Sequence, residues 1–325
     1  MKFLITGGAG FIGSAFVRLA AGRGHKVILA DSLNYAGDLK RIKGLGRKCV
    51  FYKADICDKG KMGSIFKKER PEIVVNFAAQ THVDRSILDC GIFLKTNILG
   101  TKVLIDLCRE YSIKRFVHIS TDEVYGDIEK GKFREDFPLK PNSPYAASKA
   151  SADLLVRSYV RTYGFPAIIV RPSNNYGPWQ YPEKLIPLAI LKILKGGRIP
   201  VYATGRNIRE WLFVEDCARG IMQVIGKGRL KETYNLGSNE EKRNIDVVRS
   251  ILDIMGVSYE RIEFVKDRPG HDIRYSLNST KIYKDTGWSP KVKFNQGIRQ
   301  TVQWCIDNKD WLFSKYSRIL RLYSK

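Results

Sequence analysis

The stretch KFLITGGAGFIGSAF at residues 2–16 decides the fold of this chain. Five strand-forming residues lead into glycines at positions 7, 10 and 13, and a helical pattern follows. Such glycines permit a tight turn and let a pyrophosphate approach the backbone at the start of the helix. A second apolar run ends in Asp31, 18 residues after Gly13, where a carboxylate meets the ribose hydroxyls of an adenine dinucleotide. The stretch therefore predicts a dinucleotide site, and an acid at this place favours NAD over NADP.

The first half of the chain alternates short apolar strands with amphipathic helices. Strands that are apolar on both faces and separated by helices indicate a parallel sheet with helical crossovers. We therefore expect an α/β fold with a Rossmann-type, doubly wound parallel sheet. Predicted strands cover 2–6, 26–30, 49–53, 73–78, 115–119 and 167–171, and predicted helices cover 11–22, 60–69, 92–111 and 145–163.

The second half of the chain is less regular, and no linker rich in glycine, serine or proline separates it from the first. We expect a smaller, mixed C-terminal lobe that packs on the sheet and binds the substrate. The dinucleotide-binding domain is predicted at 1–173 with a return segment at about 211–236, and the lobe at 174–210 and 237–325. Helical patterns in this half fall near 183–195, 214–226, 244–255 and 295–308.

Composition restricts the class of protein. The chain has 325 residues, and no apolar run approaches the roughly 20 residues of a membrane-spanning helix. The six cysteines are scattered without metal-ligand spacing, so we expect free thiols, no metal and a cytoplasmic location. The net charge of +23 favours an anionic partner, either a substrate or nucleic acid. Because no nucleic-acid-binding motif accompanies the charge, we expect the substrate.

Two short stretches carry the chemistry. ISTDEVYG at 119–126 ends a predicted strand with Thr121 followed by the adjacent acids Asp122 and Glu123. YAASK at 145–149 places Tyr145 and Lys149 four residues apart, on one face of a helix. A phenol with a pKa near 10 is a poor base at neutral pH. A neighbouring ammonium and the cationic nicotinamide ring of NAD would favour its phenolate form.

Thr121, Tyr145 and Lys149, together with the glycine turn, resemble the extended short-chain dehydrogenases/reductases. Longer stretches resemble one family among them, the dTDP-glucose 4,6-dehydratases. This resemblance implies a nucleotide-sugar hydro-lyase with tightly bound, recycled NAD, a homodimer, and a place in deoxysugar synthesis such as that of dTDP-rhamnose. The stretches that carry it are STDEVYG, SPYAASKA, RPSNNYGPWQYPEKLIP, NIREWLFVEDCARG, YNLGSNEEKRNIDVV and DRPGHDIRYSLN.

The resemblance assigns chemical parts to these residues. Tyr145 would take the proton of the C4 hydroxyl while NAD takes the hydride, with Lys149 and Thr121 assisting. The C4 ketone acidifies the C5 proton, which Glu123 would remove, and Asp122 would protonate the departing C6 hydroxyl. A like charge raises the pKa of one member of such a pair, so one acid can donate while its neighbour accepts.

The resemblance also implies the binding residues. For the cofactor these are Gly7, Gly10, Phe11, Ile12, Gly13, Asp31, Ser32, Leu33, Asn34, Asp55, Ile56, Ala78, Ala79, Thr96, Tyr145, Lys149 and Asn175. For the sugar nucleotide they are Thr81, Thr121, Asn174, Lys184, Leu185, Pro200, Val201, Tyr202, Arg209, Asn235, Arg268 and His271.

Other functions stay open on the sequence. A UDP-sugar 4,6-dehydratase or 4-epimerase would share the glycines, the tyrosine and the lysine, although an epimerase does not need the acid pair. A non-catalytic NAD-sensing or nucleic-acid-binding protein of the same fold is more remote. Departures from the family pattern leave thymidine and uridine carriers undecided; they lie at Trp179, Tyr181, Glu210 and Asn278.

Overall fold

The computed structural model describes residues 1–323, and the side chains of residues 1–317. Its centre is a seven-stranded sheet whose neighbouring strands are all parallel. The α/β, doubly wound prediction is therefore confirmed. The strands follow the order β10 (Thr233–Leu236), β6 (Ala167–Pro172), β5 (Arg115–Ile119), β4 (Ile73–Asn76), β1 (Lys2–Thr6), β2 (Lys26–Asp31) and β3 (Cys49–Lys53).

Strand order reverses between β1 and β4, and open α/β sheets bind ligands at such a point. The sequence analysis placed six of the seven strands. It missed β10, which holds the edge of the sheet and pairs only with β6. Its four residues, TYNL, are too short and too polar to stand out as a buried strand.

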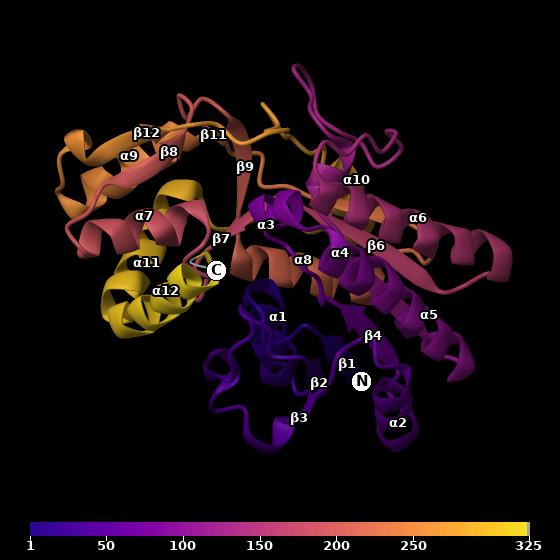
Figure 1. Cartoon of the computed structure of the whole chain (residues 1–325). Helices are drawn as coiled ribbons and strands as arrows, with labels where there is room; N and C mark the ends of the chain where they lie inside the picture. Colours follow the sequence, from indigo (N-terminus) through magenta and orange to yellow (C-terminus); the bar gives the residue numbers. More distant parts are fainter. Residues whose placement is uncertain (324–325) are drawn as a thin grey trace.

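Helices cover both faces of the sheet (Figure 1). Alternate residues of β1 point to opposite faces: Phe3 and Ile5 join one hydrophobic core, whereas Leu4 joins another. The first core also contains residues of α1 (Phe11–Gly22) and α8 (Val214–Lys227). The second contains residues of α2 (Lys59–Glu69), α5 (Thr101–Glu110) and α6 (Pro144–Tyr163).

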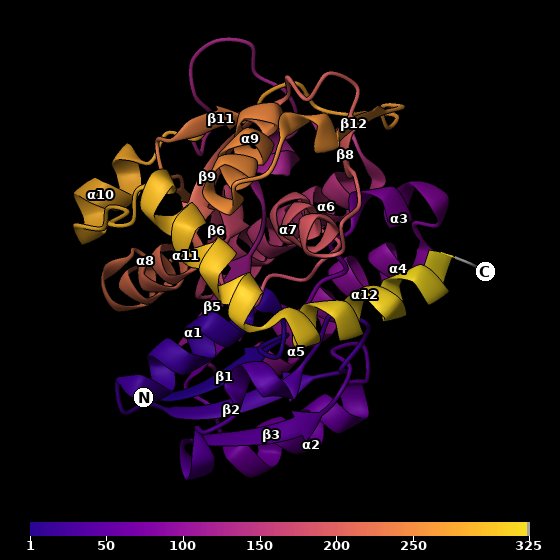
Figure 2. The same cartoon turned by 90° about the vertical axis from the view of Figure 1, so that its left-hand side faces the viewer.

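The C-terminal lobe has a core of its own, which includes Ile190, Trp211, Val248 and Trp311. Helices surround this core beside two small sheets, and α12 crosses the junction between the lobe and the β1–β3 side of the sheet (Figure 2). The lobe helices are α7 (Leu185–Leu194), α9 (Asn244–Met255), α11 (Phe294–Asp307) and α12 (Lys309–Tyr323). The strands are β7 (Asn174–Tyr176), β9 (Ile208–Phe213) and β11 (Glu241–Arg243) in one sheet, and β8 (Ile199–Tyr202) and β12 (Ile262–Val265) in the other.

The hydrophobic cores refine the predicted domain bounds in one place. Ile282 on α10 (Thr280–Thr286) and the following Trp288 pack in the core beneath α1 and α8, not in the lobe. We therefore keep the predicted division as a proposal, with 280–288 moved to the sheet half. Short helices complete the chain: η1 (Leu39–Ile42), η2 (Gly46–Lys48), α3 (Val83–Leu88), α4 (Gly91–Phe93), η4 (Asp122–Tyr125) and η5 (Tyr259–Arg261).

The helix predicted at 92–111 is interrupted by a π-helix, η3 (Leu94–Gly100), between α4 and α5. The Asn97 side chain pairs with both backbone groups of Gln80 there, at 2.8 and 3.1 Å. Gly100 allows close packing, because a Cβ at that position would lie 2.5 Å from Ile56. Wide turns of this kind are frequent at functional sites. None of the helices in the described part of the chain is long and apolar enough to cross a membrane.

Candidate active site

The glycine turn after β1 is closely packed against the neighbouring strand end. Gly7 has a φ of +68°, and a Cβ there would lie 2.5 Å from the backbone nitrogen of Ala78. A Cβ on Gly13 would lie 2.4 Å from the carbonyl oxygen of Gly7. Both positions therefore need glycine, as the sequence pattern predicted. The turn presents backbone at the start of α1, where N–H groups and the helix dipole favour an anion.

Asp31 ends β2 beside this turn. Its two carboxylate oxygens accept hydrogen bonds from the backbone nitrogens of Ala9 (2.9 Å) and Leu33 (2.8 Å). Burial raises the pKa of the carboxyl, and the two N–H donors and the charge of Arg41 oppose that rise. The backbone thus fixes the carboxylate at the mouth of the turn, with oxygen lone pairs left for two ribose hydroxyls.

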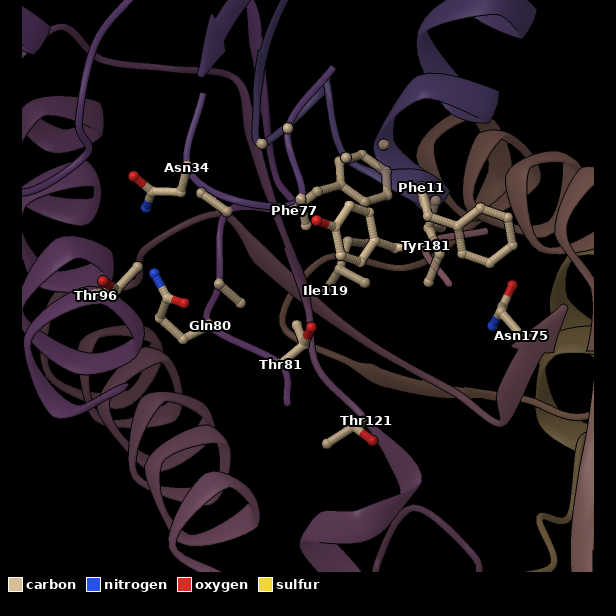
Figure 3. A pocket seen from close by; sticks show the side chains of 18 of the residues that line it. Phe11, Asn34, Phe77, Gln80, Thr81, Thr96, Ile119, Thr121, Asn175 and Tyr181 are labelled. Atoms are coloured by element: carbon tan, nitrogen blue, oxygen red, sulfur yellow. The ribbon is translucent and has the colours of Figure 1, made fainter. Parts of the chain in front are cut away.

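A cavity of about 300 Å³ lies along the carboxyl ends of the sheet strands. Every residue predicted to hold the cofactor lines this cavity except Leu33, which contributes its backbone N–H to Asp31. Figure 3 shows Thr81, Ile119 and Thr121 from strand ends around the hollow, with Thr96 on one side and Asn175 on the other. The cavity is therefore long enough to join the glycine turn to the proposed catalytic residues.

Tyr145 and Lys149 project from the first turns of α6 into this cavity. The Lys149 ammonium donates to the carbonyl oxygen of Ile119 at 2.7 Å, and burial lowers its pKa to about 8. Burial, with the charge of Glu123 next, raises the pKa of Tyr145 well above its usual value. The surroundings in the protein alone thus oppose a phenolate, and a cation bound in the cavity would counter that effect.

Asp122 and Glu123 begin the short helix η4, directly after β5. The Thr121 hydroxyl donates to Asp122 at 3.2 Å and accepts from the Glu123 backbone nitrogen at 3.3 Å. Burial, then the charges of Glu123 and Glu210, raises the pKa of Asp122 well above its ordinary value. Burial also raises the pKa of Glu123, but Arg268 and Lys184 oppose the rise. The pair is therefore unequal: Asp122 holds a proton more firmly than Glu123.

A buried network fixes η4 against the catalytic helix. The guanidinium of Arg171 donates to Asp153 at 2.8 Å and to the Tyr125 hydroxyl at 2.6 Å. Asp153 lies one helical turn after Lys149, and Tyr125 ends η4. Asn235, which the resemblance assigned to the substrate, instead accepts from the Tyr125 hydroxyl at 2.8 Å and donates to Phe133. It is fully buried and lines neither of the two cavities described here.

A second cavity of about 290 Å³ opens between the strand ends and the C-terminal lobe. Arg209, Arg268 and Lys184 give it a cationic wall. Arg209 already donates to the carbonyl oxygens of Ile208, Asp272 and Ile273, whereas the Nε of Arg268 is buried without a partner among the described residues. Most of the predicted sugar-nucleotide residues line this cavity: Asn174, Lys184, Leu185, Pro200, Val201, Tyr202, Arg209, Arg268 and His271. Thr81 and Thr121 line the first cavity instead.

The two cavities meet at a shared set of residues. Within the described side chains, buried oxygens of Asn174, Asn175, Asp122 and Glu123 have no hydrogen-bond partner. Unpartnered buried polar atoms are costly, and they mark positions where a ligand supplies the missing partner. The residues common to both cavities are Glu123, Asn174, Asn175, Gln180, Glu183 and Lys184.

Several lining residues were missed by the sequence analysis. Arg41 lies in the basic stretch LKRIKGLGRK at 39–48 and was not predicted to line the site, yet it is buried at the first cavity. In the motif GPWQYPEK only Lys184 was predicted as a site residue, although Gln180 and Glu183 also line both cavities. The other missed residues are Tyr35, Gln80 and Tyr181 in the first cavity and Trp211, Asn244 and Tyr275 in the second. Among the described residues, no cluster of acids, histidines or cysteines could hold a metal ion.

The fold and this site define a nucleotide-sugar-modifying member of the extended short-chain dehydrogenases/reductases. A family model described as GDP-mannose 4,6 dehydratase matches residues 4–301. The chain is 48% identical to a dTDP-glucose 4,6-dehydratase of Neisseria meningitidis, with 95% of this chain and 94% of the relative covered. It is 46% identical to dTDP-glucose 4,6-dehydratase 1 of Escherichia coli, with 96% and 94% covered. The chain belongs to the dTDP-glucose 4,6-dehydratase family.

Solved structures of this family and of a related epimerase have the same fold as this chain. DesIV, a dTDP-glucose 4,6-dehydratase of Streptomyces venezuelae with NAD and TYD bound, superposes with a TM-score of 0.94. It is 43% identical, with 97% of this chain and 100% of that chain covered. A UDP-glucose 4-epimerase of Thermus thermophilus in complex with NAD gives a TM-score of 0.88 at 32% identity, with 94% and 98% covered. Because the epimerase shares the fold, the fold alone does not identify the reaction.

Proposed function

We propose that this chain is a dTDP-glucose 4,6-dehydratase, which converts dTDP-glucose to dTDP-4-keto-6-deoxyglucose and water. One observation supports this most strongly: Asp122 and Glu123 share a buried cavity with Tyr145 and Lys149, and their pKa values are shifted unequally. An epimerase needs only the tyrosine and lysine. A dehydratase also needs an acid and a base for the loss of water, and the pair supplies both.

NAD is the cofactor that the first cavity fits. The glycine turn accepts a diphosphate, and the Asp31 carboxylate is placed for ribose hydroxyls but would repel a 2′-phosphate. Arg41, the cation nearest to Asp31, already donates to the carbonyl oxygens of Ala9, Ala36 and Trp179. Bound NAD accepts a hydride from C4 of the sugar and later returns it to C6.

The first step oxidises C4. Tyr145, as phenolate, takes the proton of the C4 hydroxyl while the hydride leaves the same carbon. Lys149 holds its ammonium 2.7 Å from the Ile119 carbonyl, so the charge is fixed one helical turn from the phenol. The Thr121 hydroxyl lies within hydrogen-bonding distance of both Asp122 and the Glu123 backbone and can orient the reacting oxygen. The product is a C4 ketone and a protonated Tyr145.

The second step removes water across C5 and C6. Glu123 takes the C5 proton, which the ketone has acidified, and Asp122 gives its proton to the departing C6 hydroxyl. Return of the hydride to C6 and of the Glu123 proton to C5 completes the product. Asp122 is then ionised and Tyr145 protonated, so one proton passes between them through solvent before the next cycle. The raised pKa of Asp122 is what makes it the donor.

The second cavity is proposed for the nucleotide part of the substrate. Arg268 has an unpartnered buried Nε, and a guanidinium binds phosphate oxygens well. Pro200, Val201 and Tyr202, from β8, form one wall and are proposed to contact the base. The relatives named for dTDP-glucose support thymidine as the carrier.

A substrate assay tests the proposal. The purified protein is incubated with dTDP-glucose and, in parallel, with UDP-glucose, without added NAD, and products are identified by mass spectrometry and NMR. We expect a 4-keto-6-deoxy sugar from dTDP-glucose and at least tenfold slower conversion of UDP-glucose, as expected for a pocket that distinguishes one methyl group and one hydroxyl. If neither substrate gives a product, the assay is repeated with NAD added in excess. No product in that repeat would refute the dehydratase assignment.

We propose a homodimer because apolar side chains are exposed on adjoining helices: Leu99 (59%) lies on η3, and Leu154 (54%) lies on α6. Light scattering of a Leu154→Glu variant should then show monomer.

The scattered free cysteines support a cytoplasmic location. The product class places the enzyme in deoxysugar synthesis, with dTDP-rhamnose as the expected end product.

A further inference from the structure

We infer that the C-terminal helix α12 retains the cofactor by holding down the segment that covers it. This segment, residues 32–42, is called the cofactor strap here. Its members Ser32, Asn34, Tyr35, Ala36, Gly37 and Arg41 line the first cavity. The inference rests on the proposed function only in taking NAD as the ligand of that cavity. It assigns a role to Trp311 and Lys315, which neither the motifs nor the catalytic steps explain.

The contact between α12 and the strap is made through Asp38. The indole nitrogen of Trp311 donates to the Asp38 carboxylate at 2.8 Å, and the Lys315 ammonium lies 2.6 Å from the same oxygen. The three side chains are mostly sheltered: Trp311 is 7% exposed, and the side chains of Lys315 and Asp38 are 17% and 10% exposed. Charge-assisted bonds in such a setting are stronger than surface ion pairs.

The strap in turn holds the glycine turn. The backbone nitrogen of Asp38 and the guanidinium of Arg41 both donate to the carbonyl oxygen of Ala9, at 3.0 and 2.8 Å. Ala9 lies between Gly8 and Gly10, in the turn that meets the cofactor diphosphate. The Arg41 guanidinium also lies over the Trp311 ring, 5.4 Å from its centroid. A continuous set of contacts therefore runs from α12 through the strap to the backbone that binds the cofactor.

Two more contacts join the strap to the lobe. The Tyr35 hydroxyl donates to Glu183 at 3.1 Å, and Arg41 donates to the Trp179 carbonyl at 3.0 Å. Trp179 and Trp311 pack edge to face with centroids 5.3 Å apart, inside the lobe core. Trp179 and Trp311 are therefore anchored in the core of the lobe, whereas within the strap η1 is the one regular element. In Figure 2, α12 crosses the junction between the β1–β3 side and the lobe, where such a bridge is needed.

Retention matters for the proposed reaction. The hydride taken from C4 must return to C6 of the same sugar, so a cofactor that leaves in mid-cycle strands an oxidised or dehydrated sugar and an inactive enzyme. A surface segment with few contacts opens more often than a packed one, and each opening would let the cofactor leave. The bonds from Trp311 and Lys315 to Asp38 stabilise the closed position and so slow dissociation.

Exchange of bound NAD for labelled NAD tests the inference. The full-length protein, purified with NAD, is mixed with excess radiolabelled NAD, and label retained after rapid gel filtration is followed with time. We expect Lys315→Met and Asp38→Asn each to speed exchange about tenfold, the effect of losing one charge-assisted hydrogen bond. Trp311→Phe keeps an aromatic ring but removes the indole N–H, and it should speed exchange about threefold. Lys309→Met, on the exposed first residue of the same helix, is the matched control and should leave the rate unchanged.

A double-mutant cycle identifies the contact. Because Lys315 acts through Asp38, the double variant Asp38→Asn/Lys315→Met should exchange NAD no faster than Asp38→Asn alone. Turnovers completed without added NAD should fall in the same order, and free NAD should restore them. Parent-like exchange in both single variants, or full additivity in the double, would overturn the inference. A parent that binds NAD but converts no sugar nucleotide would refute the proposed function alone; a parent that binds no NAD would refute both.

Discussion

The two cavities of this molecule are built in different ways. The first lies along the ends of consecutive sheet strands, and backbone geometry, glycines and a few fixed side chains define it. The second is assembled from residues between His82 and Tyr275, which the lobe brings together by long-range packing. Chemistry belongs to the first cavity and recognition to the second. We therefore expect substitutions at strand ends to lower kcat, and substitutions in the lobe to raise KM.

The largest expected effect is at Tyr145. Tyr145→Phe removes one hydroxyl from a side chain that is 7% exposed and whose ring packs on Phe93. General-base catalysis contributes roughly 10²–10⁴-fold, so we expect kcat to fall by about 10³ with KM within threefold of the parent. The measurements are steady-state kinetics and absorbance at 340 nm after mixing with substrate. Tyr163→Phe, at the exposed end of the same helix, is the control. A variant with normal kcat would contradict the assigned base.

Asp122→Asn separates the two chemical steps at the same strand end. The amide keeps the shape of the side chain but cannot give up a proton, so water loss should slow about 10²-fold while C4 oxidation continues. Absorbance at 340 nm should then accumulate in a single turnover to a higher level than in the parent. Asp136→Asn, an exposed aspartate paired with Arg134, serves as control. Equal slowing of both steps would contradict the role of Asp122 as acid.

Arg268→Met examines the other cavity. Its guanidinium lies 3.7 Å from Asp84 and has a buried, unpartnered Nε, so it is available for a phosphate oxygen. Loss of one charged hydrogen bond to the substrate should raise KM about 10- to 100-fold, with a smaller fall in kcat because the charge of Arg268 also lowers the pKa of Glu123. Arg243→Met, a surface pair with Asp246, is the control. A fall in kcat with unchanged KM would remove the functional distinction between the cavities.

The same distinction explains what the sequence could predict. Each of the six predicted strands is a mostly apolar run, although β5 includes His118 and β6 includes Arg171, so these strands and the residues at their ends could be assigned from local pattern alone. The edge strand β10 has only four residues, and its place depends on pairing with β6, which no local pattern records. The π-helix at 94–100 was also missed, because the pattern of apolar residues predicts only a helix and not its type; Asn97 in this helix bonds to the backbone of Gln80.

Local sequence pattern also predicts some of the site residues, whereas long-range packing decides the others. The catalytic and cofactor residues lie on motifs with fixed spacing, and the structure brings them to one cavity. Burial decides the roles of Arg41, which was not predicted as a site residue, and of Asn235, whose contact with the substrate stays a prediction. Arg41 lies in a run of lysines and arginines but is 2% exposed, and Asn235 is enclosed with Tyr125 at full burial. A buried arginine and a solvated arginine can have the same neighbours in the sequence. Local sequence composition therefore does not distinguish them.

The smallest expected effect is on folding stability, which the buried Asp122 should lower as pH rises. Burial raises the folded pKa of Asp122 above its ordinary 3.8, so the folded protein binds this proton more tightly than the unfolded chain. Stability from this group is therefore complete below about pH 4 and is lost as pH rises through the folded pKa. Asp122→Asn cannot ionise. Its Tm should match the parent near pH 4 and exceed it by a few degrees at pH 8, as scanning calorimetry can measure.

Asp136→Asn should change stability with pH in the opposite direction and is therefore the control for Asp122→Asn. Hydrogen bonds from Arg134 hold the pKa of Asp136 below its ordinary value, so its small stabilisation is present at neutral pH and fades as pH falls. That substitution should lower Tm slightly or not at all at pH 8, and the difference should vanish in acid. If Asp122→Asn lowers Tm at pH 8, as Asp136→Asn is expected to do, then folding does not raise the pKa of Asp122, and this carboxyl is ionised in the folded protein. It could not then be the proton donor, and Glu123, with Arg268 and Lys184 nearby, could no longer be distinguished from it.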